Sequence, residues 1–487
     1  MSKIRNLVQK AAGNGVLQYI FSRYATYFVQ FINSLFIAVF LGPYYLGIWG
    51  FISLIIQYLT QLNLGIPHSV NALVSVHKNK EWYVEKIIGA SLTMLFGLSI
   101  LIILFFGANE VFNFDIGGKY NFSLYVPLVI VIGIFGHFNS LFSNIFRIYG
   151  RITEIAINQS ILPFLMLIAI FIFRGNDLLW ALVCANLFAF AFSMGMYLIK
   201  MPVDLKPIFA TRLIKIIQIK GWHLFVYNTS FYLIIISTKS FISAYYTVEE
   251  FGYFTFAFSL AHAVLMLLES FSFLVYPKLL NRLAFSTAEK ITSLLKIIRD
   301  VYITTSHLLI HLAIFVFPIF LMFFPQYELT SKSFKLIALT VVLYTNSFGY
   351  TGLLIAKGEE KKLGYVSLFA LGINTLSALF VIKILHVPFS SAIIATTATY
   401  MIYIYILGYL GRKTIGSDTS VRMVLKDIYP MRLIIPFSLS LSFIIFSFPA
   451  FLLVVPLALF LVLNCKVLKN LRQITLSIVN NSKVFNI

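Results

Sequence analysis

The sequence predicts an all-α polytopic membrane protein with about fourteen transmembrane helices, arranged as two pseudo-symmetric six-helix lobes and a C-terminal helix pair. Hydrophobic residues make up 60% of the 487 residues, charged residues make up only 11%, and the mean hydropathy is +0.91. Such a chain has too little polar surface for a soluble globule. Fourteen apolar stretches are each long enough to cross a bilayer. Basic residues also alternate between successive loops, which is typical of proteins with many spans.

Short loops separate the predicted spans. The last two spans are shorter than the others and are joined by Phe448, Pro449 and Ala450, so the sequence leaves open whether they cross fully or form a re-entrant hairpin. In chain order, the spans are 16–41, 46–74, 87–107, 123–146, 152–173, 178–199, 223–246, 252–276, 299–324, 335–356, 363–385, 388–410, 431–447 and 449–465.

The distribution of basic residues predicts the orientation of the chain. When a residue at a span end is counted with the adjoining loop, thirty of the 37 Lys and Arg residues lie at the termini and in every second loop, four lie in the other loops and three lie deeper within spans. Because positively charged loops face the cytoplasm, both termini are predicted to be cytoplasmic. The net charge of +20 does not indicate nucleic-acid binding, since the basic residues flank spans in small clusters such as Lys78, Lys80 and Lys86.

Three further features exclude other classes of protein. The first span follows a basic segment without a small-residue cleavage site, which predicts an uncleaved span. The two cysteines, Cys184 and Cys465, predict neither a disulfide framework nor a metal site. The external loops are brief, the longest covering residues 108–122, so the chain has no room for a folded domain outside the membrane.

An internal repeat predicts two related halves. The turn at residues 41–49 resembles the turn at 247–254, because each places a glycine followed by bulky residues at the start of a helix. The segment 147–151 corresponds in the same way to 356–360. The offsets of 205 and 208 residues agree with one duplication, and six spans per copy give both copies the same orientation. The alternative is that glycine–aromatic turns recur by chance.

The repeat and the basic loops together divide the chain into four segments. These are an N-terminal six-helix lobe at 1–200, a cytoplasmic inter-lobe linker at 201–222, a C-terminal six-helix lobe at 223–411, and a basic loop, the last helix pair and a cytoplasmic tail at 412–487.

Four short segments carry a resemblance to a known family. Over most of residues 10–415, their order and the twelve-plus-two topology resemble the polysaccharide-unit (O-antigen, Wzx-type) flippases of the multidrug/oligosaccharidyl-lipid/polysaccharide exporter superfamily. The second turn departs from the first because it lacks the Gly-Pro pair. The segments are Phe40-Leu41-Gly42-Pro43 through Gly47-Ile48-Trp49, Glu249-Glu250-Phe251-Gly252-Tyr253, Tyr276-Pro277-Lys278-Leu279 and Ile355-Ala356-Lys357-Gly358.

The resemblance implies a transporter rather than an enzyme. It implies a bacterial inner-membrane flippase for O-antigen or polysaccharide biosynthesis, which moves undecaprenyl-diphosphate-linked oligosaccharides by alternating access of two lobes around a central cavity. It implies no cofactor. Its partners are the lipid-linked substrate, membrane lipids, a polysaccharide polymerase and a chain-length regulator. Nothing in the sequence specifies the glycan, the coupling ion or the oligomeric state.

Three ionisable residues within spans are functional candidates, because a charge inside a bilayer is expensive. Arg23 lies in the first span and Lys239 in the seventh, and both are predicted to bind the anionic diphosphate. Glu269 is the one carboxylate clearly inside a predicted span and is the candidate for ion coupling. The alternatives are that the two cations snorkel toward the headgroups and that Glu269 has a structural partner.

Polar side chains in the spans are candidates for contacts with sugar hydroxyls, although interhelical hydrogen bonds explain such residues equally well. His307 and His311 have metal-ligand spacing but no third ligand, so a bundle-lining pair is favoured and no metal site is predicted. No Walker loop, dinucleotide motif or nucleophile elbow is present. The candidates for sugar contacts are Gln30, Asn33, Gln61, Asn228, Tyr344 and Asn346.

The sequence therefore favours a flippase for lipid-linked oligosaccharides and leaves three alternatives. A peptidoglycan-precursor flippase shares fourteen spans and a cationic cavity, and the sequence separates it poorly. A cation-coupled multidrug antiporter of the same superfamily is expected to have acidic residues in its cavity, whereas the intramembrane charge here is mostly cationic. A membrane sugar polymerase is disfavoured by the short external loops.

Overall fold

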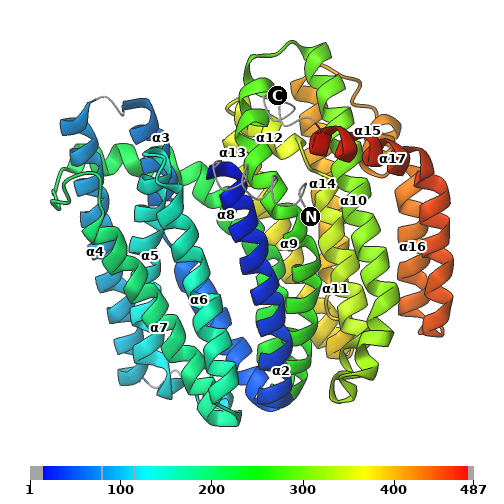
Figure 1. Cartoon of the computed structure of the whole chain (residues 1–487), viewed down its shortest axis with the longest axis horizontal. Coiled ribbons are helices and arrows are strands. Elements are labelled where there is room, and N and C mark those ends of the chain that lie inside the picture. Colours follow the sequence, from blue (N-terminus) through cyan, green and yellow to red (C-terminus); the bar gives the residue numbers. More distant parts are fainter. Residues whose placement is uncertain (1–14, 78–79, 113–115, 481–487) are drawn as a thin grey trace. The chain divides into compact units, whose positions relative to one another are not determined.

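The computed structural model describes residues 15–77, 80–112 and 116–480. Over these residues the chain forms α-helices joined by short turns and single 3-10 or π-helical turns, and it contains no strand (Figure 1). The all-α fold class predicted from the sequence is confirmed.

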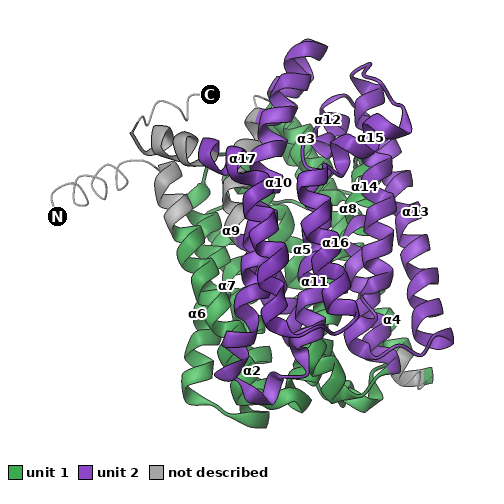
Figure 2. Cartoon of the chain, turned by 90° about the vertical axis from the view of Figure 1, so that its right-hand side faces the viewer, with its two compact units in different colours: residues 1–229, 246–255 green, residues 230–245, 256–487 purple. Residues whose placement is uncertain are grey.

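The chain forms two compact units, which Figure 2 shows in different colours. Unit 1 comprises residues 1–229 and 246–255, and unit 2 comprises residues 230–245 and 256–487. The boundaries fall inside two long helices, α8 (Thr211–Tyr245) and α9 (Val248–Phe285), so each of these helices belongs partly to both units. The four segments inferred from the sequence divide the chain by topology and stay a prediction.

Unit 1 contains the helices of the first six predicted spans. Helix α2 holds the first predicted span and the first part of the second, because Gly42 leaves the helical region with φ 69° and ψ 171° and Pro43 follows it. Glycine adopts this positive φ without the strain of a Cβ atom, so the chain kinks between two helical halves without a loop. The predicted second span, 46–74, is broken after Gln61 and continues in α3. The helices are α2 (Gly15–Gln61), α3 (Ile66–His77), α4 (Glu81–Phe112), α5 (Val126–Ile148), α6 (Ile152–Ile172) and α7 (Gly175–Ile199).

Unit 2 contains two bent helix pairs. Helices α11 and α12 meet at 40° next to Gly349, whose φ is 87°, so the predicted tenth span is broken. Helices α15 and α16 meet at 71°. The predicted last two spans correspond to α16 and α17. The helices are α10 (Ala288–Met322), α11 (Thr330–Thr345), α12 (Tyr350–Ala356), α13 (Glu360–Leu379), α14 (Ile394–Thr414), α15 (Val421–Ile428), α16 (Met431–Ile445) and α17 (Val454–Asn480).

Within the described ranges, nine helices are long and apolar enough to cross a membrane, or eleven when each bent pair counts as one span. Helix α2 counts once although it covers the first predicted span and more than half of the second, and α8 and α9 are not among the nine. These apolar helices identify the chain as a multi-pass membrane protein.

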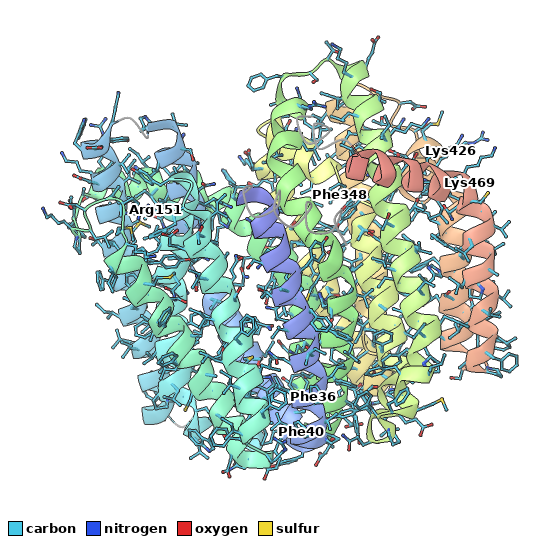
Figure 3. The ribbon with its side chains drawn as sticks, in the orientation of Figure 1. Phe36, Phe40, Arg151, Phe348, Lys426 and Lys469 are labelled. Atoms are coloured by element: carbon cyan, nitrogen blue, oxygen red, sulfur yellow. The ribbon has the colours of Figure 1, made fainter. Side chains whose placement is uncertain are left out.

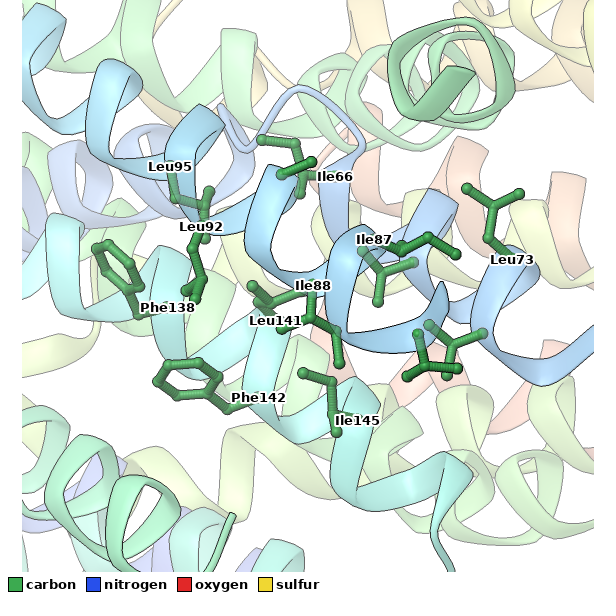
Figure 4. Close-up of a cluster of buried hydrophobic side chains, with 14 of the residues drawn as sticks. Ile66, Leu73, Ile87, Ile88, Leu92, Leu95, Phe138, Leu141, Phe142 and Ile145 are labelled. Atoms are coloured by element: carbon green, nitrogen blue, oxygen red, sulfur yellow. The ribbon is translucent and has the colours of Figure 1, made fainter. Parts of the chain in front are cut away.

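The core of unit 1 is an apolar cluster between α3, α4 and α5 (Figure 4). Ile66, Ile87 and Leu141 are fully buried in it, and the rings of Phe138 and Phe142 pack against one another with their centroids 6.2 Å apart. Side chains from three helices therefore fix these helices to one another. This cluster is a scaffold for the polar residues of α2, α6 and α7.

The second pair of repeated segments has the same backbone geometry in both copies. Gly150 and Gly358 both have a φ of 74°. The N–H that follows each glycine donates back to the helix, from Arg151 to the Phe146 carbonyl at 2.9 Å and from Glu359 to the Leu354 carbonyl at 2.8 Å. Both are the six-to-one hydrogen bond of a glycine-terminated helix, and they lie 208 residues apart. This geometry supports the duplication inferred from the sequence.

The first pair of repeated turns forms a contact within unit 1. A Cβ atom on Gly47 would overlap the carbonyl oxygen of Val248, and a Cβ atom on Gly252 would overlap that of Pro43. With the offset of 205 residues, position 43 corresponds to 248 and position 47 to 252, so the two contacts are equivalent by the repeat. Such reciprocal contacts are typical of a two-fold arrangement. Only glycine allows the two helix starts to approach so closely.

The polar and aromatic ends of each unit can be followed in Figure 3. In unit 1, Arg151 lies at the upper end of the helices, and Phe36 and Phe40 lie at the lower end. In unit 2, Lys426 and Lys469 lie at the upper end. In each unit, these labelled basic residues lie at the end that the loop charges predict to be cytoplasmic. The orientation in the membrane stays a prediction.

Candidate functional site

The predicted cation of the first span lies in a polar seam between α2 and α6 of unit 1. Arg23 donates from Nη1 to Gln159 Oε1 at 2.7 Å and from Nη2 to the hydroxyl of Tyr27 at 2.5 Å. Its guanidinium carbon also lies 4.6 Å from the centre of the Tyr27 ring. Both hydrogen-bond acceptors are neutral. Among the side chains that the structure describes, no carboxylate forms an ion pair with Arg23.

The seam continues along one face of α2. The hydroxyls of Thr26 and Ser160 lie 2.8 Å apart, and Asn33 donates from its amide to the Pro163 carbonyl at 2.7 Å. Arg23, Thr26 and Asn33 share this face because their spacing of three and seven residues follows the helical period. Gln30 is half-buried, and its Oε1 has no hydrogen-bond partner among the described residues. The seam therefore combines one cation with several neutral polar groups.

A cavity of about 770 Å³ opens beside this seam, in the size range of pockets that hold small ligands. Its lining combines the hydroxyls of Ser22, Thr153 and Ser160 with Phe164, Phe188 and other apolar side chains of α6 and α7. Ser22 precedes Arg23 in the chain, and Ser160 follows Gln159, the acceptor of the Arg23 hydrogen bond. The cavity therefore lies beside the arginine, although Arg23 itself is not part of its lining.

The second predicted cation lies inside unit 2. Lys239 is only 3% exposed, and its Nζ is 5.4 Å from the centre of the Phe258 ring. The imidazole of His262 lies against the same ring, with the centroids 4.3 Å apart and the planes tilted by 38°. His262 Nε2 is a buried nitrogen without a hydrogen-bond partner among the described residues. Lys239 is therefore buried in the helix bundle and does not extend into the headgroup region by snorkelling.

Neutral polar groups next to Lys239 join α8, α13 and α14. Thr238 and Thr396 share a hydrogen bond of 2.6 Å between their hydroxyls. The amide of Asn374 donates to the Ile234 carbonyl at 2.6 Å and to the Ser237 hydroxyl at 2.9 Å. The polar neighbours seen in the sequence around Lys239 therefore lie on the bundle side of α8.

The other predicted site residues have different surroundings. The Asn228 amide lies 3.3 Å from His68 Nε2 in unit 1, and Gln61 is half-buried at the last position of α2. In unit 2, the ring of Tyr344 is half-buried against Phe231, with a centroid distance of 6.0 Å.

Asn346 and Glu269 complete the predicted set. Asn346 is 2% exposed, accepts from His307 Nε2 at 3.0 Å and donates to the Ile428 carbonyl at 3.1 Å. These are the interhelical hydrogen bonds that the sequence left open as an alternative. His311 lies on the same helix, with its Nδ1 2.7 Å from the His307 carbonyl. Glu269 lies in α9, and its side chain is outside the described part of the chain.

Sequence reasoning missed a buried ionic network in unit 2. The carboxylate of Asp427 lies 3.8 Å from Arg299 and 3.5 Å from Arg412, and it accepts a hydrogen bond from the Tyr350 hydroxyl. Asp300 forms a second ion pair with Arg432 at 2.6 Å. The acidic residues lie near predicted span ends, where a sequence does not distinguish a solvated loop charge from a paired one. The residues Gln159 and Ser160 of unit 1 were visible only as a polar run in the fifth span.

Comparison with solved structures identifies the fold. Lipid II flippase MurJ in an inward closed conformation has a TM-score of 0.60 and 13% identity, over 96% of this chain and 100% of that chain. An inward-facing MATE family multidrug resistance transporter of the MOP superfamily has a TM-score of 0.57 and 13% identity, over 82% and 95%. A MOP superfamily transporter from Pyrococcus furiosus, whose binding pocket of reverse polarity suggests a different function, has a TM-score of 0.50 and 14% identity, over 82% and 93%.

No protein-family model and no curated protein sequence matches the chain. At these levels of identity, the solved structures show the fold alone. The chain has the fold of MOP superfamily transporters.

Proposed function

We propose that this chain is a flippase that moves undecaprenyl-diphosphate-linked oligosaccharide units from the cytoplasmic to the outer leaflet by alternating access. The observation that carries the proposal is the state of Arg23. It is a half-buried cation in an apolar helix, its described hydrogen-bond acceptors are neutral, and a cavity opens beside it. An uncompensated cation in a membrane span is a candidate site for an anionic ligand.

The geometry of Arg23 suits a diphosphate. Gln159 and Tyr27 hold two of its nitrogens, which fixes the plane of the guanidinium without neutralising its charge. The remaining donors of the planar group match phosphate oxygens, and such charge-assisted hydrogen bonds are the strong ones. The half-buried seam residue Gln30 suits a sugar hydroxyl, since an amide both donates and accepts.

Lys239 provides a second cation in the other half of the chain. It is buried in unit 2, with its Nζ 5.4 Å from the centre of the Phe258 ring, against which His262 also lies. In the proposed cycle, Arg23 binds the diphosphate first and Lys239 binds it at a later stage of the passage. Outward movement of an anion runs with an inside-negative potential, by about 2.3 kcal/mol per charge per 100 mV. Glu269 then assists the return of the empty carrier by binding a cation.

The second candidate function is flipping of a peptidoglycan precursor. The lipid II flippase MurJ matches 96% of this chain, whereas the MATE structure matches 82%. A fold that includes the last helix pair therefore favours a lipid-linked substrate over a small drug. The cationic character of Arg23 and Lys239 also disfavours a cation antiporter, and a transporter with reversed pocket polarity exists in the same superfamily. A sugar polymerase is the least favoured function, because the solved structures similar to this chain are transporters.

The proposal includes location and partners. A carrier of this substrate acts in the bacterial inner membrane with both termini in the cytoplasm. It delivers the lipid-linked oligosaccharide to a polysaccharide polymerase in the outer leaflet. A chain-length regulator acts together with that polymerase. Neither a cofactor nor a nucleic acid takes part.

Depletion of the protein in its native cell tests this function. We expect an undecaprenyl-diphosphate-linked oligosaccharide repeat unit to accumulate on the cytoplasmic face, where a membrane-impermeant sugar-modifying reagent does not reach it in intact cells. Accumulation of lipid II instead would assign the peptidoglycan role. Normal levels of both lipids, together with a raised sensitivity to cationic drugs, would overturn the proposal in favour of a multidrug transporter.

A further inference from the structure

The segment that joins α7 to α8 packs on unit 1. Residues 201–210 run between the two helices as irregular chain, in the part that the sequence predicts to be the inter-lobe linker. Their side chains alternate, because Val203 and Leu205 are half-buried whereas Asp204 and Lys206 are exposed. This two-residue alternation is typical of an extended chain with one edge packed on the protein.

The middle of the segment lies directly on the backbone of α4. The Ile208 N–H donates to the Gly89 carbonyl at 3.1 Å, and a Cβ atom on Gly89 would overlap the carbonyl oxygen of Lys206. A glycine in the interior of a helix costs about 1 kcal/mol relative to alanine. Here it allows two backbones to touch, which a side chain at this position would prevent.

The start of the segment is attached to the beginning of α6. Arg151 donates from Nη1 to the Lys200 carbonyl at 2.6 Å, and Lys200 Nζ lies 3.7 Å from the carboxylate of Glu154 in the first turn of α6. The side chains of Met201 and Leu205 then pack against the apolar cluster of α3, α4 and α5. The segment is thus fixed to unit 1 before it reaches Gly89.

The first turns of α8 are attached to α3. The Ser69 hydroxyl donates to the Ile217 carbonyl at 2.5 Å, and the Ile217 side chain is buried in the apolar cluster. A Cβ atom on Gly65 would lie 2.6 Å from the Gly221 carbonyl oxygen, and one on Gly221 would lie 2.7 Å from that of Gly65. Residues 200–221 are therefore attached to unit 1 at their start, middle and end.

We propose that residues 200–221 are a clamp that stays docked on unit 1 throughout the transport cycle, in place of a flexible tether between the two halves. The clamp joins α3, α4 and α6 at the end predicted to be cytoplasmic. The inference rests on the alternating access of the proposed function and deepens it, because it restricts where the chain bends. The first part of α8 moves with unit 1, so the change in angle between the halves takes place beyond Gly221.

Spin labels show whether the segment is fixed, and they need no ligand. Lys206→Cys and Asn176→Cys place labels on two exposed residues of unit 1, in full-length protein with Cys184→Ala and Cys465→Ala. In nanodiscs, we expect a distance distribution as narrow as that of a matched pair on two helices, Lys86→Cys with Asn176→Cys. A clearly broader distribution for the Lys206 pair would overturn the clamp.

Gly89→Ala tests the attachment to α4. The added methyl group would displace the chain at Lys206, so exchange of the Ile208 amide hydrogen in the purified protein should accelerate by ~10-fold or more. Gly97→Ala on the same helix is the matched control, because a Cβ atom at Gly97 has open space around it, and it should leave the exchange unchanged. Equal exchange in the two variants would show that the segment does not lie on α4.

A crosslink tests whether the clamp stays docked while the protein works. Lys86 lies three positions before Gly89 on α4, so cysteines at Lys86 and Lys206 should be joined by bis-maleimidoethane. With the native cysteines replaced, crosslinked cells should export lipid-linked oligosaccharide at the rate of uncrosslinked cells. Efficient crosslinking that stops export would overturn the clamp. Failure of the proposed function is a separate result, since it changes the lipid found on depletion but not the spin-label distances.

Discussion

Two arginines in the two units have contrasting partners. Arg23 of unit 1 donates to the side chains of Gln159 and Tyr27, both neutral. Arg299 of unit 2 is 4% exposed, donates to the carbonyls of Phe348 at 3.0 Å and Asp427 at 3.3 Å, and lies 3.8 Å from the Asp427 carboxylate. One cation keeps its charge available, whereas the other is neutralised and bound to the backbone.

The partners of a cation in a membrane helix indicate whether it has a structural or a ligand-binding role. A buried cation with a carboxylate and backbone acceptors fixes helices to one another, and here Arg299 joins α10 to α15 and to the turn before α12. A cation with neutral partners has no local charge balance and gains one only from a ligand. Sequence alone ranks both as intramembrane or near-membrane charges.

The largest effect is expected from breaking the unit 2 network. Asp427→Ala leaves the buried Arg299 without its carboxylate, and it also removes the partner of Arg412 and the acceptor of Tyr350. Loss of one partner of a buried pair costs on the order of 3 kcal/mol. We expect a lower melting temperature of the purified protein, followed by intrinsic fluorescence, and a lower yield.

Lys426→Ala is the matched control, because this exposed lysine is a neighbour of Asp427 in α15. An unchanged melting temperature in Asp427→Ala would show that the network does not stabilise unit 2.

A second prediction sharpens the contrast at Arg23. Arg23→Ala should reduce export by ~10- to 100-fold, the equivalent of about 1.5–3 kcal/mol for hydrogen bonds to a charged group, while the melting temperature stays the same. Arg23→Lys should rescue export only in part, since lysine is a point charge without the planar fork. The measurements are export in cells at matched protein levels and the melting temperature of the purified variants.

Arg174→Ala controls for loss of a positive charge in unit 1, because Arg174 lies over the Phe40 ring in the loop before α7. A drop in melting temperature for Arg23→Ala as large as that for Asp427→Ala would place Arg23 among the structural cations.

Lys239 tests whether burial alone makes a cation structural. It is as buried as Arg299, at 3% exposure, but its Nζ lies over the ring of Phe258, 5.4 Å from the centre. Lys239→Met keeps the side-chain volume and removes a buried charge, so stability should not fall. We expect diphosphate binding to weaken by about tenfold, as one charge-assisted contact is lost. A destabilised Lys239→Met with normal binding would contradict this assignment.

Much of the fold could be predicted from the sequence, because apolar length and loop charge act locally along the chain. The turn at residues 41–49, where Gly42 kinks α2, and the glycine turns at Gly150 and Gly358 were visible as repeated motifs. The site was less predictable. Gln159 and Asp427 gain their roles only from helices far away in the sequence, and Asn346 looked like a sugar ligand until its two interhelical bonds were known. Tertiary partners of a polar side chain leave no local signal.

The smallest effect is expected from substituting two nearby amides of α2, which extend the comparison to neutral residues. The side-chain oxygens of both residues have no partner among the described residues, but the Asn33 amide nitrogen donates to the Pro163 carbonyl, whereas no hydrogen bond is described for the Gln30 side chain. Gln30→Ala should therefore weaken recognition of the sugars by about 1 kcal/mol, or roughly fivefold, without lowering the melting temperature. Asn33→Ala should lower the melting temperature and change the affinity per folded molecule little. The measurements are binding of the native lipid-linked oligosaccharide in nanodiscs and thermal unfolding. If Gln30→Ala lowers the melting temperature and Asn33→Ala weakens binding, then Gln30 is structural and Asn33 contacts the substrate.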